Sequence, residues 1–209
     1  MISILIADDH AIVREGLKQI VSSQPDMNVS GEAHNAQGVL DLVRARHWDV
    51  VVLDINMPGR NGLEVLKELK QQRPNLPVLV LSVHPEEQYG IRVLRSGASG
   101  YMNKESAPEE LVNAIRKVIR GGKYLTPTLA ERLAFQVADG SEAPTHEKLS
   151  DRELQVLCLI ASGKTVSDIA GDLSLSVKTI STYRARILEK MEMKSNAELT
   201  RYALENNLA

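Results

Sequence analysis

The stretch Asp49-Val50-Val51-Val52-Leu53-Asp54 contains an unbroken apolar segment that ends in a carboxylate. Such a Val/Leu segment is typical of a parallel strand buried on both faces. Three other apolar segments end in polar residues in the same way, at Asp8-Asp9, at Ser82 and at Lys104. In open α/β sheets, ligands bind outside the carboxyl ends of the strands. The sequence therefore predicts that three carboxylates, a hydroxyl and a lysine meet at one edge, where they suit a cation and a phosphate group.

Strand and helix patterns alternate five times over residues 1–122, which predicts an α/β domain with parallel strands and crossover helices. Pro58-Gly59 and Asn61-Gly62 indicate a loop, Ser106 to Glu109 a capping box, and Gly121-Gly122 a helix end. We expect a flavodoxin-like, doubly wound, five-stranded sheet. The expected strands are 2–7, 28–33, 49–54, 77–81 and 99–102, and the expected helices are 12–23, 36–46, 61–72, 86–96 and 107–120.

The remaining residues predict a linker and a small helical domain. Residues 123–147 are expected to be a linker with one short helix (Thr128–Ala138) and a polar tether (Asp139–Thr145). Residues 148–209 show helix patterns and no strand pattern. Capping signals are expected at Ser150, Thr165, Ser176 and Ser195. Two short helices joined by a tight turn predict a helix-turn-helix within a four-helix domain.

Composition limits the classes of function. The 209 residues carry a net charge of −2, and residues 148–209 hold nine basic and eight acidic side chains, so a DNA surface would have to be a local patch. The single Cys158 lies at helical spacing with apolar residues, which favours a packing role. No apolar segment approaches the ~20 residues of a membrane span. We expect a cytoplasmic protein that does not contact a membrane.

The motifs resemble two-component response regulators of the NarL/FixJ family over essentially the whole chain. Asp8-Asp9, Asp54 with Met57-Pro58-Gly59, Ser82 and Lys104 stand at receiver-domain spacing. Glu105 follows Lys104, where many receivers have proline. The C-terminal residues resemble a LuxR-type DNA-binding domain, and the string from Thr182 to Lys190 looks closest to regulators of virulence and secondary metabolism.

The resemblance and the preference of Mg²⁺ for oxygen ligands imply a phosphorylation site. Asp54 would be the phosphoacceptor, and Mg²⁺ would be held by Asp8, Asp9, Asp54 and the carbonyl of Asn56. Lys104 would neutralise the phosphoryl group, and Ser82 would donate to it. The resemblance also gives Tyr101 an inward-facing switch role. His10 and His84 flank this edge, and we expect them to be solvated loop residues rather than ligands.

The helix expected from Val177 to about Glu192 presents a small and basic face opposite its apolar stripe, which suits a DNA major groove. Arg184 falls within the apolar stripe, and we expect it either to extend its charged end to solvent or to pair with an acid of the first C-terminal helix, rather than to touch DNA. Lys178, Thr182 and Ala185 are candidates for base contacts, and Arg186 and Lys190 for phosphate contacts. The full predicted DNA surface is Lys178, Thr179, Ser181, Thr182, Ala185, Arg186 and Lys190.

The sequence leaves three functions open. The leading one is a phosphorylation-controlled transcription factor, which is not an enzyme. Its expected partners are a sensor histidine kinase, double-stranded promoter DNA and a second copy of the chain on phosphorylation, with RNA polymerase as a further candidate. An Mg²⁺-dependent phosphatase would need a cap insertion, for which the short loops leave no room. A receiver that only docks proteins would be favoured by a missing acid or lysine, and none is missing.

Overall fold

The computed structural model describes residues 1–57, 60–139 and 144–208, and it describes the side chains of all of these except 136–139. The predicted turn at Pro58-Gly59 and most of the predicted tether lie outside these residues. The chain divides into two compact units, Met1–Ala134 and Phe135–Ala209. None of the helices among the described residues is long and apolar enough to cross a membrane.

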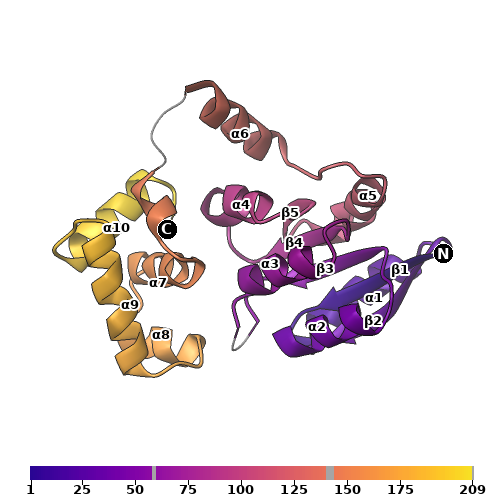
Figure 1. Ribbon diagram of the computed structural model, residues 1–209, viewed down its shortest axis with the longest axis horizontal. Helices are drawn as coiled ribbons and strands as arrows, with labels where there is room; N and C mark the ends of the chain where they lie inside the picture. The colour runs from indigo at the N-terminus through magenta and orange to yellow at the C-terminus, as the bar shows by residue number, and fades with distance from the viewer. Residues whose placement is uncertain (58–59, 140–143, 209) are drawn as a thin grey trace. The chain divides into compact units, whose positions relative to one another are not determined.

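The first unit is built on a five-stranded sheet in which all neighbouring strands are parallel, in the order β2-β1-β3-β4-β5 (Figure 1). The central strand β3 and its neighbour β4 are buried along their whole length, as their continuous apolar sequences predict. This confirms the expected flavodoxin-like sheet. The strands are β1 (Ile2–Ala7), β2 (Met27–Ala33), β3 (Val50–Asp54), β4 (Val78–Ser82) and β5 (Gly100–Asn103).

Five crossover helices connect or follow these strands, and each lies within two residues of its predicted bounds. One core joins apolar residues of the sheet to α1 and α5, including Ile4, Leu17 and Leu111, while α2 and α3 contact one another. The helices are α1 (Ala11–Ser22), α2 (Ala36–Ala45), α3 (Gly62–Gln72), α4 (Glu86–Arg95) and α5 (Ala107–Ile119).

The predicted capping box at the start of α5 is wrong. Ser106 makes no side-chain cap, and its backbone is already helical (φ −84°, ψ −9°). Its Oγ instead donates to the carbonyl oxygen of Asn103 at 3.0 Å. The Oδ1 of Asn103 also accepts from the Glu105 N–H at 2.9 Å. Both hydrogen bonds to Asn103 stabilise the loop from β5 into α5.

The segment that follows α5 packs on the first unit. Tyr124 forms a parallel bridge with Gly100 of β5, and a Cβ at Gly100 would lie 2.7 Å from the Tyr124 carbonyl oxygen. The Thr126 hydroxyl donates to the Glu86 carboxylate at 2.6 Å. Leu129 is fully buried and faces Gly90 of α4. The helix α6 (Pro127–Asp139) begins here, close to the predicted short helix. The predicted domain boundary at residue 122 stays a prediction, but the packing extends past it.

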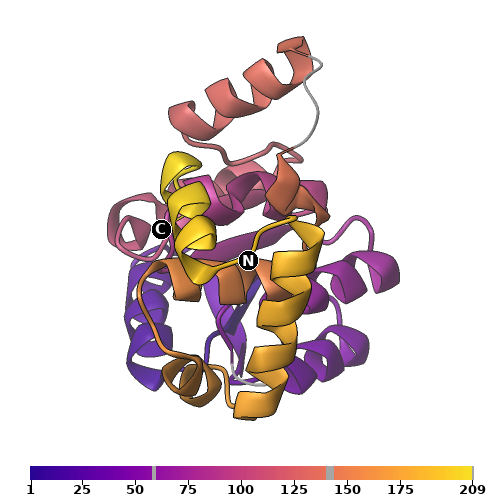
Figure 2. The ribbon, with the colours of Figure 1, turned by 90° about the vertical axis from the view of Figure 1, so that its left-hand side faces the viewer.

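The second unit is helical, as predicted. After a 3₁₀ turn η1 (Thr145–Lys148) come α7 (Asp151–Ala161), α8 (Val166–Asp172), α9 (Val177–Lys190) and α10 (Asn196–Glu205). The side chains of Ser150, Thr165, Ser176 and Ser195 all cap helices as expected. Cys158 is buried on α7. Figure 2 shows α8 meeting the start of α9, which is the helix-turn-helix arrangement.

An ion pair links α7 to α9. Glu153 is 2% exposed, and its Oε2 accepts from the Ser150 N–H at 2.7 Å and from Lys190 Nζ at 2.6 Å. Burial raises the pKa of the Glu153 carboxyl, but Lys190 and Ser150 outweigh burial, so the pKa lies below its ordinary value. The charged form of Glu153 therefore stabilises the folded unit.

We expect Leu129→Ala to lower the free energy of unfolding of the first unit by about 3 kcal/mol, because it leaves a cavity beside Gly90. Trp48 is the only tryptophan in the chain and is buried in this unit. Its fluorescence during urea denaturation reports the unit selectively. Phe135→Ala, on the exposed side of the same helix, is the control, with a change within about 0.5 kcal/mol. An unchanged midpoint for Leu129→Ala would mean that the segment does not stabilise the first unit.

We expect Glu153→Gln to destabilise the second unit by about 1–2 kcal/mol at neutral pH, since a charge-assisted hydrogen bond is lost. Because the folded pKa is lowered, the contribution is present above the ordinary glutamate pKa and disappears as the pH falls through the folded pKa. Amide hydrogen exchange of α7 between pH 3 and pH 7 measures this. The exposed pair Arg201–Glu205 supplies the control Glu205→Gln, which should have no measurable effect. A parent and variant with the same pH dependence would contradict the role of Glu153.

Candidate phosphorylation site and DNA surface

The register of the sheet brings the predicted polar residues to one edge. Ala7 lies opposite Leu53, Asp54 opposite Leu81, and Ser82 opposite Asn103. The strands β1, β3, β4 and β5 thus end at nearly the same level. Asp8-Asp9 and Lys104, which directly follow β1 and β5, meet Asp54 and Ser82 there.

Lys104 lies between two buried carboxylates. Its Nζ is 2.7 Å from Asp54 Oδ2 and 2.6 Å from Asp8 Oδ2, and both aspartates are 1% exposed. Burial raises the pKa of Asp54, and the neighbouring Lys104 only partly reverses this. Burial lowers the pKa of Lys104, but Asp54 and Asp8 outweigh burial and leave this pKa above its ordinary value. The lysine is therefore held in its charged form beside the carboxylates.

The third carboxylate completes a cluster of oxygen ligands. One ligand atom from each of Asp8, Asp9, His10 and Asp54 lies within 4.8 Å of the others. Asp9 Oδ1 is buried and accepts no hydrogen bond within the part of the chain that the structure describes. Carboxylate oxygens are the ligands that Mg²⁺ prefers, so this cluster suits a cation. The backbone N–H of Asn56 donates to Asp54 Oδ1 at 2.9 Å, which places Asn56 directly beside the cluster.

Ser82 and Tyr101 meet at the backbone of His84. The Ser82 Oγ accepts from the His84 N–H at 3.0 Å, and the Tyr101 hydroxyl donates to the His84 carbonyl oxygen at 2.8 Å. Tyr101 is fully buried, and burial raises the pKa of its hydroxyl. The side chain of Tyr101 is thus buried, and its predicted switch role stays a prediction. Its hydroxyl and the Ser82 hydroxyl both hold the loop that leads into α4.

The residues predicted to contact DNA lie on α9, which is labelled in Figure 1. Ile180 and Ile187 are buried on its opposite side. Thr179 is half-buried and its Oγ1 lies 2.8 Å from Ser176 Oγ. The other predicted DNA-contacting residues are exposed, namely Lys178, Ser181, Thr182, Ala185, Arg186 and Lys190.

Two basic residues of α9 have partners that the sequence did not reveal. Lys190 is paired with the buried Glu153, so its ammonium group already has an anionic partner. Arg184 donates from Nε to Asn196 Oδ1 at 2.6 Å, so its partner is an amide, and the alternative of pairing with an acid of α7 is wrong. Asn196 is the first residue of α10, the next helix along the chain. The spacing of residues within α9 therefore could not predict this contact.

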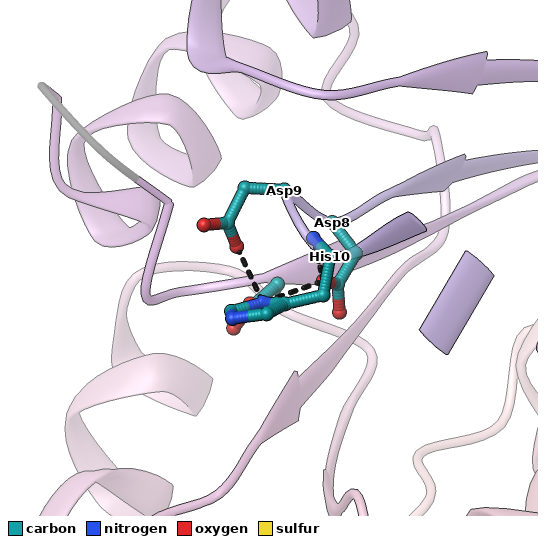
Figure 3. Close-up of side chains that lie close together, drawn as sticks. Asp8, Asp9 and His10 are labelled. Carbon is teal, nitrogen blue, oxygen red and sulfur yellow. Dashed lines mark hydrogen bonds and ion pairs between the residues drawn. The ribbon is translucent and has the colours of Figure 1, made fainter. Parts of the chain in front are cut away.

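Sequence reasoning also missed two contacts of the residues Asp8 and Asp9. Arg14 Nη1 donates to the Asp8 carbonyl oxygen at 2.8 Å, which ties α1 to the end of β1. His10 has an exposed ring, as expected, but its Nδ1 lies 2.9 Å from Asp9 Oδ1 (Figure 3). Because His10 directly follows Asp8-Asp9 in the sequence, this contact could have been predicted.

Comparisons with known proteins agree with this geometry. Residues 4–116 match the response regulator receiver domain, and residues 147–203 match the bacterial regulatory proteins of the luxR family. Response regulator GacA of Pseudomonas aeruginosa is 36% identical over 209 residues, covering 100% of this chain and 98% of that protein. Response regulator UvrY of Escherichia coli (strain K12) is 34% identical over 209 residues, covering 100% of this chain and 96% of that protein.

Solved structures of the RcsB response regulator of Salmonella typhimurium are similar in fold. One, described by its conformational dynamism for DNA interaction, has a TM-score of 0.69 at 27% identity and covers 98% of each chain. Another is bound to promoter P1flhDC in the presence of the phosphomimetic BeF₃⁻. It has a TM-score of 0.60 at 28% identity and covers 99% of this chain and 98% of that one. With its acidic edge, its lysine and its helix-turn-helix, the chain belongs to the NarL/FixJ family of response regulators, in which a receiver domain precedes a LuxR-type DNA-binding domain.

Proposed function

We propose that Asp54 accepts a phosphoryl group from a phosphohistidine of a sensor histidine kinase. One observation carries the proposal: the buried Asp54 carboxylate lies 2.7 Å from the Lys104 ammonium and beside two further carboxylates. An Asp54 oxygen forms the new bond to phosphorus as the bond from phosphorus to the histidine nitrogen breaks. The histidine nitrogen leaves with the electron pair of that bond. Asp54 is the phosphoacceptor of this transfer, and the regulator is not itself an enzyme.

The oxygen atoms of these residues suit Mg²⁺. Asp9 and Asp54 would hold it by their carboxylates, Asp8 through a water, and Asn56 by its backbone carbonyl. When bound, Mg²⁺ would neutralise negative charge on the transferring phosphoryl oxygens.

Three side chains would respond to phosphorylation of Asp54, namely those of Lys104, Ser82 and Tyr101. Lys104 already contacts Asp54, so its ammonium is positioned to pair with a phosphoryl oxygen. Ser82 would donate its hydroxyl hydrogen to the phosphoryl group. Because Ser82 and Tyr101 hold the same His84 backbone, a shift of Ser82 would change the loop before α4.

The output would be promoter binding by a phosphorylation-dependent homodimer. One RcsB structure is described as two dimers bound to two parallel DNAs, and the one with promoter P1flhDC was determined in the presence of the phosphomimetic BeF₃⁻. A single α9 with few basic side chains supports modest affinity, and pairing two copies makes the second DNA contact intramolecular. Promoter binding would take place in the cytoplasm, where RNA polymerase is a further candidate partner.

Asp54→Asn should abolish phosphate incorporation from acetyl phosphate with Mg²⁺, because the amide is isosteric with the carboxylate and cannot act as the nucleophile. Labelling followed by acid and base treatment measures the acyl phosphate. Asp41→Asn, at an exposed acid of α2, is the matched control and should label like the parent. Equal labelling of Asp54→Asn and the parent would place the phosphoacceptor elsewhere.

On the DNA surface, Lys178→Ala should lower discrimination between specific and scrambled DNA by about 1–3 kcal/mol, because a base contact is lost. Arg186→Ala should weaken both DNAs alike and reduce the slope of log affinity against log salt by about one. Fluorescence anisotropy at several salt concentrations measures both effects. If Lys178→Ala behaved like Arg186→Ala, the inferred orientation of α9 in the groove would be incorrect.

A further inference from the structure

The acidic cluster has a nitrogen neighbour, His10, at the point where β1 leads into α1. His10 Nδ1 lies 2.9 Å from Asp9 Oδ1 and 3.3 Å from Asp8 Oδ1 (Figure 3). The backbone also orients the residue, because the His10 N–H donates to Asp8 Oδ1 at 2.8 Å. The imidazole is thus held against the same carboxylates that would bind a cation.

The contact between His10 and Asp9 is close, yet Asp9 Oδ1 accepts no hydrogen bond within the described residues. The two atoms lie within the distance of an ion pair. Around a divalent ion with bonds of about 2.1 Å, neighbouring octahedral ligand atoms are about 3.0 Å apart. The two His10 distances bracket that value. The distances from His10 Nδ1 to the two carboxylate oxygens therefore fit ligands of one ion, as well as an ion pair.

Lys104 does not compete for this position. Its ammonium is paired with the Oδ2 atoms of Asp8 and Asp54, whereas His10 approaches the Oδ1 atoms of Asp8 and Asp9. The lysine and the histidine therefore use different oxygens of the cluster. A cation on the Oδ1 side would have a nitrogen ligand available while the lysine stays in place.

We propose that His10 Nδ1 is a metal ligand that makes this site prefer transition-metal dications such as Co²⁺ over Mg²⁺. The proposal rests on the cation site of the proposed function. Mg²⁺ gains little from imidazole, because it favours oxygen ligands and retains several waters. Transition-metal dications bind imidazole well. A neutral ring with its proton on the solvent-exposed Nε2 would leave the Nδ1 lone pair for the metal.

The test is titration calorimetry of the full-length parent and of His10→Ala with Co²⁺ and with Mg²⁺. We expect the ratio of Co²⁺ to Mg²⁺ affinity to fall about tenfold or more in His10→Ala, because one nitrogen ligand is lost. His47→Ala is the matched control, since His47 is an exposed histidine that precedes β3 at the other end of that strand. His47→Ala should have the same ratio of Co²⁺ to Mg²⁺ affinity as the parent.

A second readout observes the ring directly. The chain has five histidines, and in Co²⁺-loaded protein the ring resonances of one of them should move outside the range of the metal-free spectrum. That set of resonances should be absent from His10→Ala. His10→Asn serves as a second variant, because asparagine is a favoured residue at the N-cap position that His10 occupies. It should reproduce the lowered ratio with the fold retained.

The remaining outcomes separate this proposal from the proposed function. If both His10 variants had the same ratio of Co²⁺ to Mg²⁺ affinity as the parent, His10 would not be a ligand, and the proposed magnesium site would be unaffected. An equal loss of Co²⁺ and Mg²⁺ affinity would show that His10 only positions Asp9, which also overturns it. If the parent bound neither metal, the cation site of the proposed function would fail together with this inference.

Discussion

Repulsion among carboxylates is the constraint that shapes the receiver unit. Asp8 and Asp54 are both 1% exposed, and Asp9 lies beside them. Burial raises the pKa of Asp54, and the neighbouring Asp8 carboxylate adds to this effect. Lys104 relieves part of it through two contacts, at 2.6 and 2.7 Å. The residual negative charge leaves the site ready to gain from a cation.

This arrangement depends on the register of four strands, since each supplies or precedes one member of the site. Backbone hydrogen bonds across the edge maintain the alignment, such as Lys104 N–H to the Ser82 carbonyl oxygen at 2.8 Å and Asp8 N–H to the Ala33 carbonyl oxygen at 3.1 Å. A one-residue slip in a strand would turn its terminal side chain to the other face of the sheet. The buried apolar strands therefore contribute to function by fixing where their last residues lie.

Much of this could be predicted because the underlying signals are local or periodic. Continuous apolar segments indicate buried parallel strands, and strand ends indicate the shared edge, so the sequence alone is enough to group Asp54, Ser82 and Lys104. Helix caps such as Ser150 follow from short-range hydrogen bonding. The pairing of Lys190 with Glu153 and of Arg184 with Asn196 could not be predicted, because each depends on how two helices pack. Ser106 failed as a cap because its backbone is already helical, whereas a capping residue has an extended backbone.

The bridge between Tyr124 and Gly100 has a consequence for solubility. In the order β2-β1-β3-β4-β5, β5 is an outer strand, and outer strands offer unpaired backbone groups to any other extended chain. The Tyr124 N–H donates to the Ser99 carbonyl oxygen at 2.9 Å, and the Lys123 ammonium donates to the Ala98 carbonyl oxygen at 2.6 Å. The start of the interdomain connection thus occupies the approach to β5 with backbone and a charged side chain. A segment that joins two domains also protects the first of them from strand-to-strand aggregation.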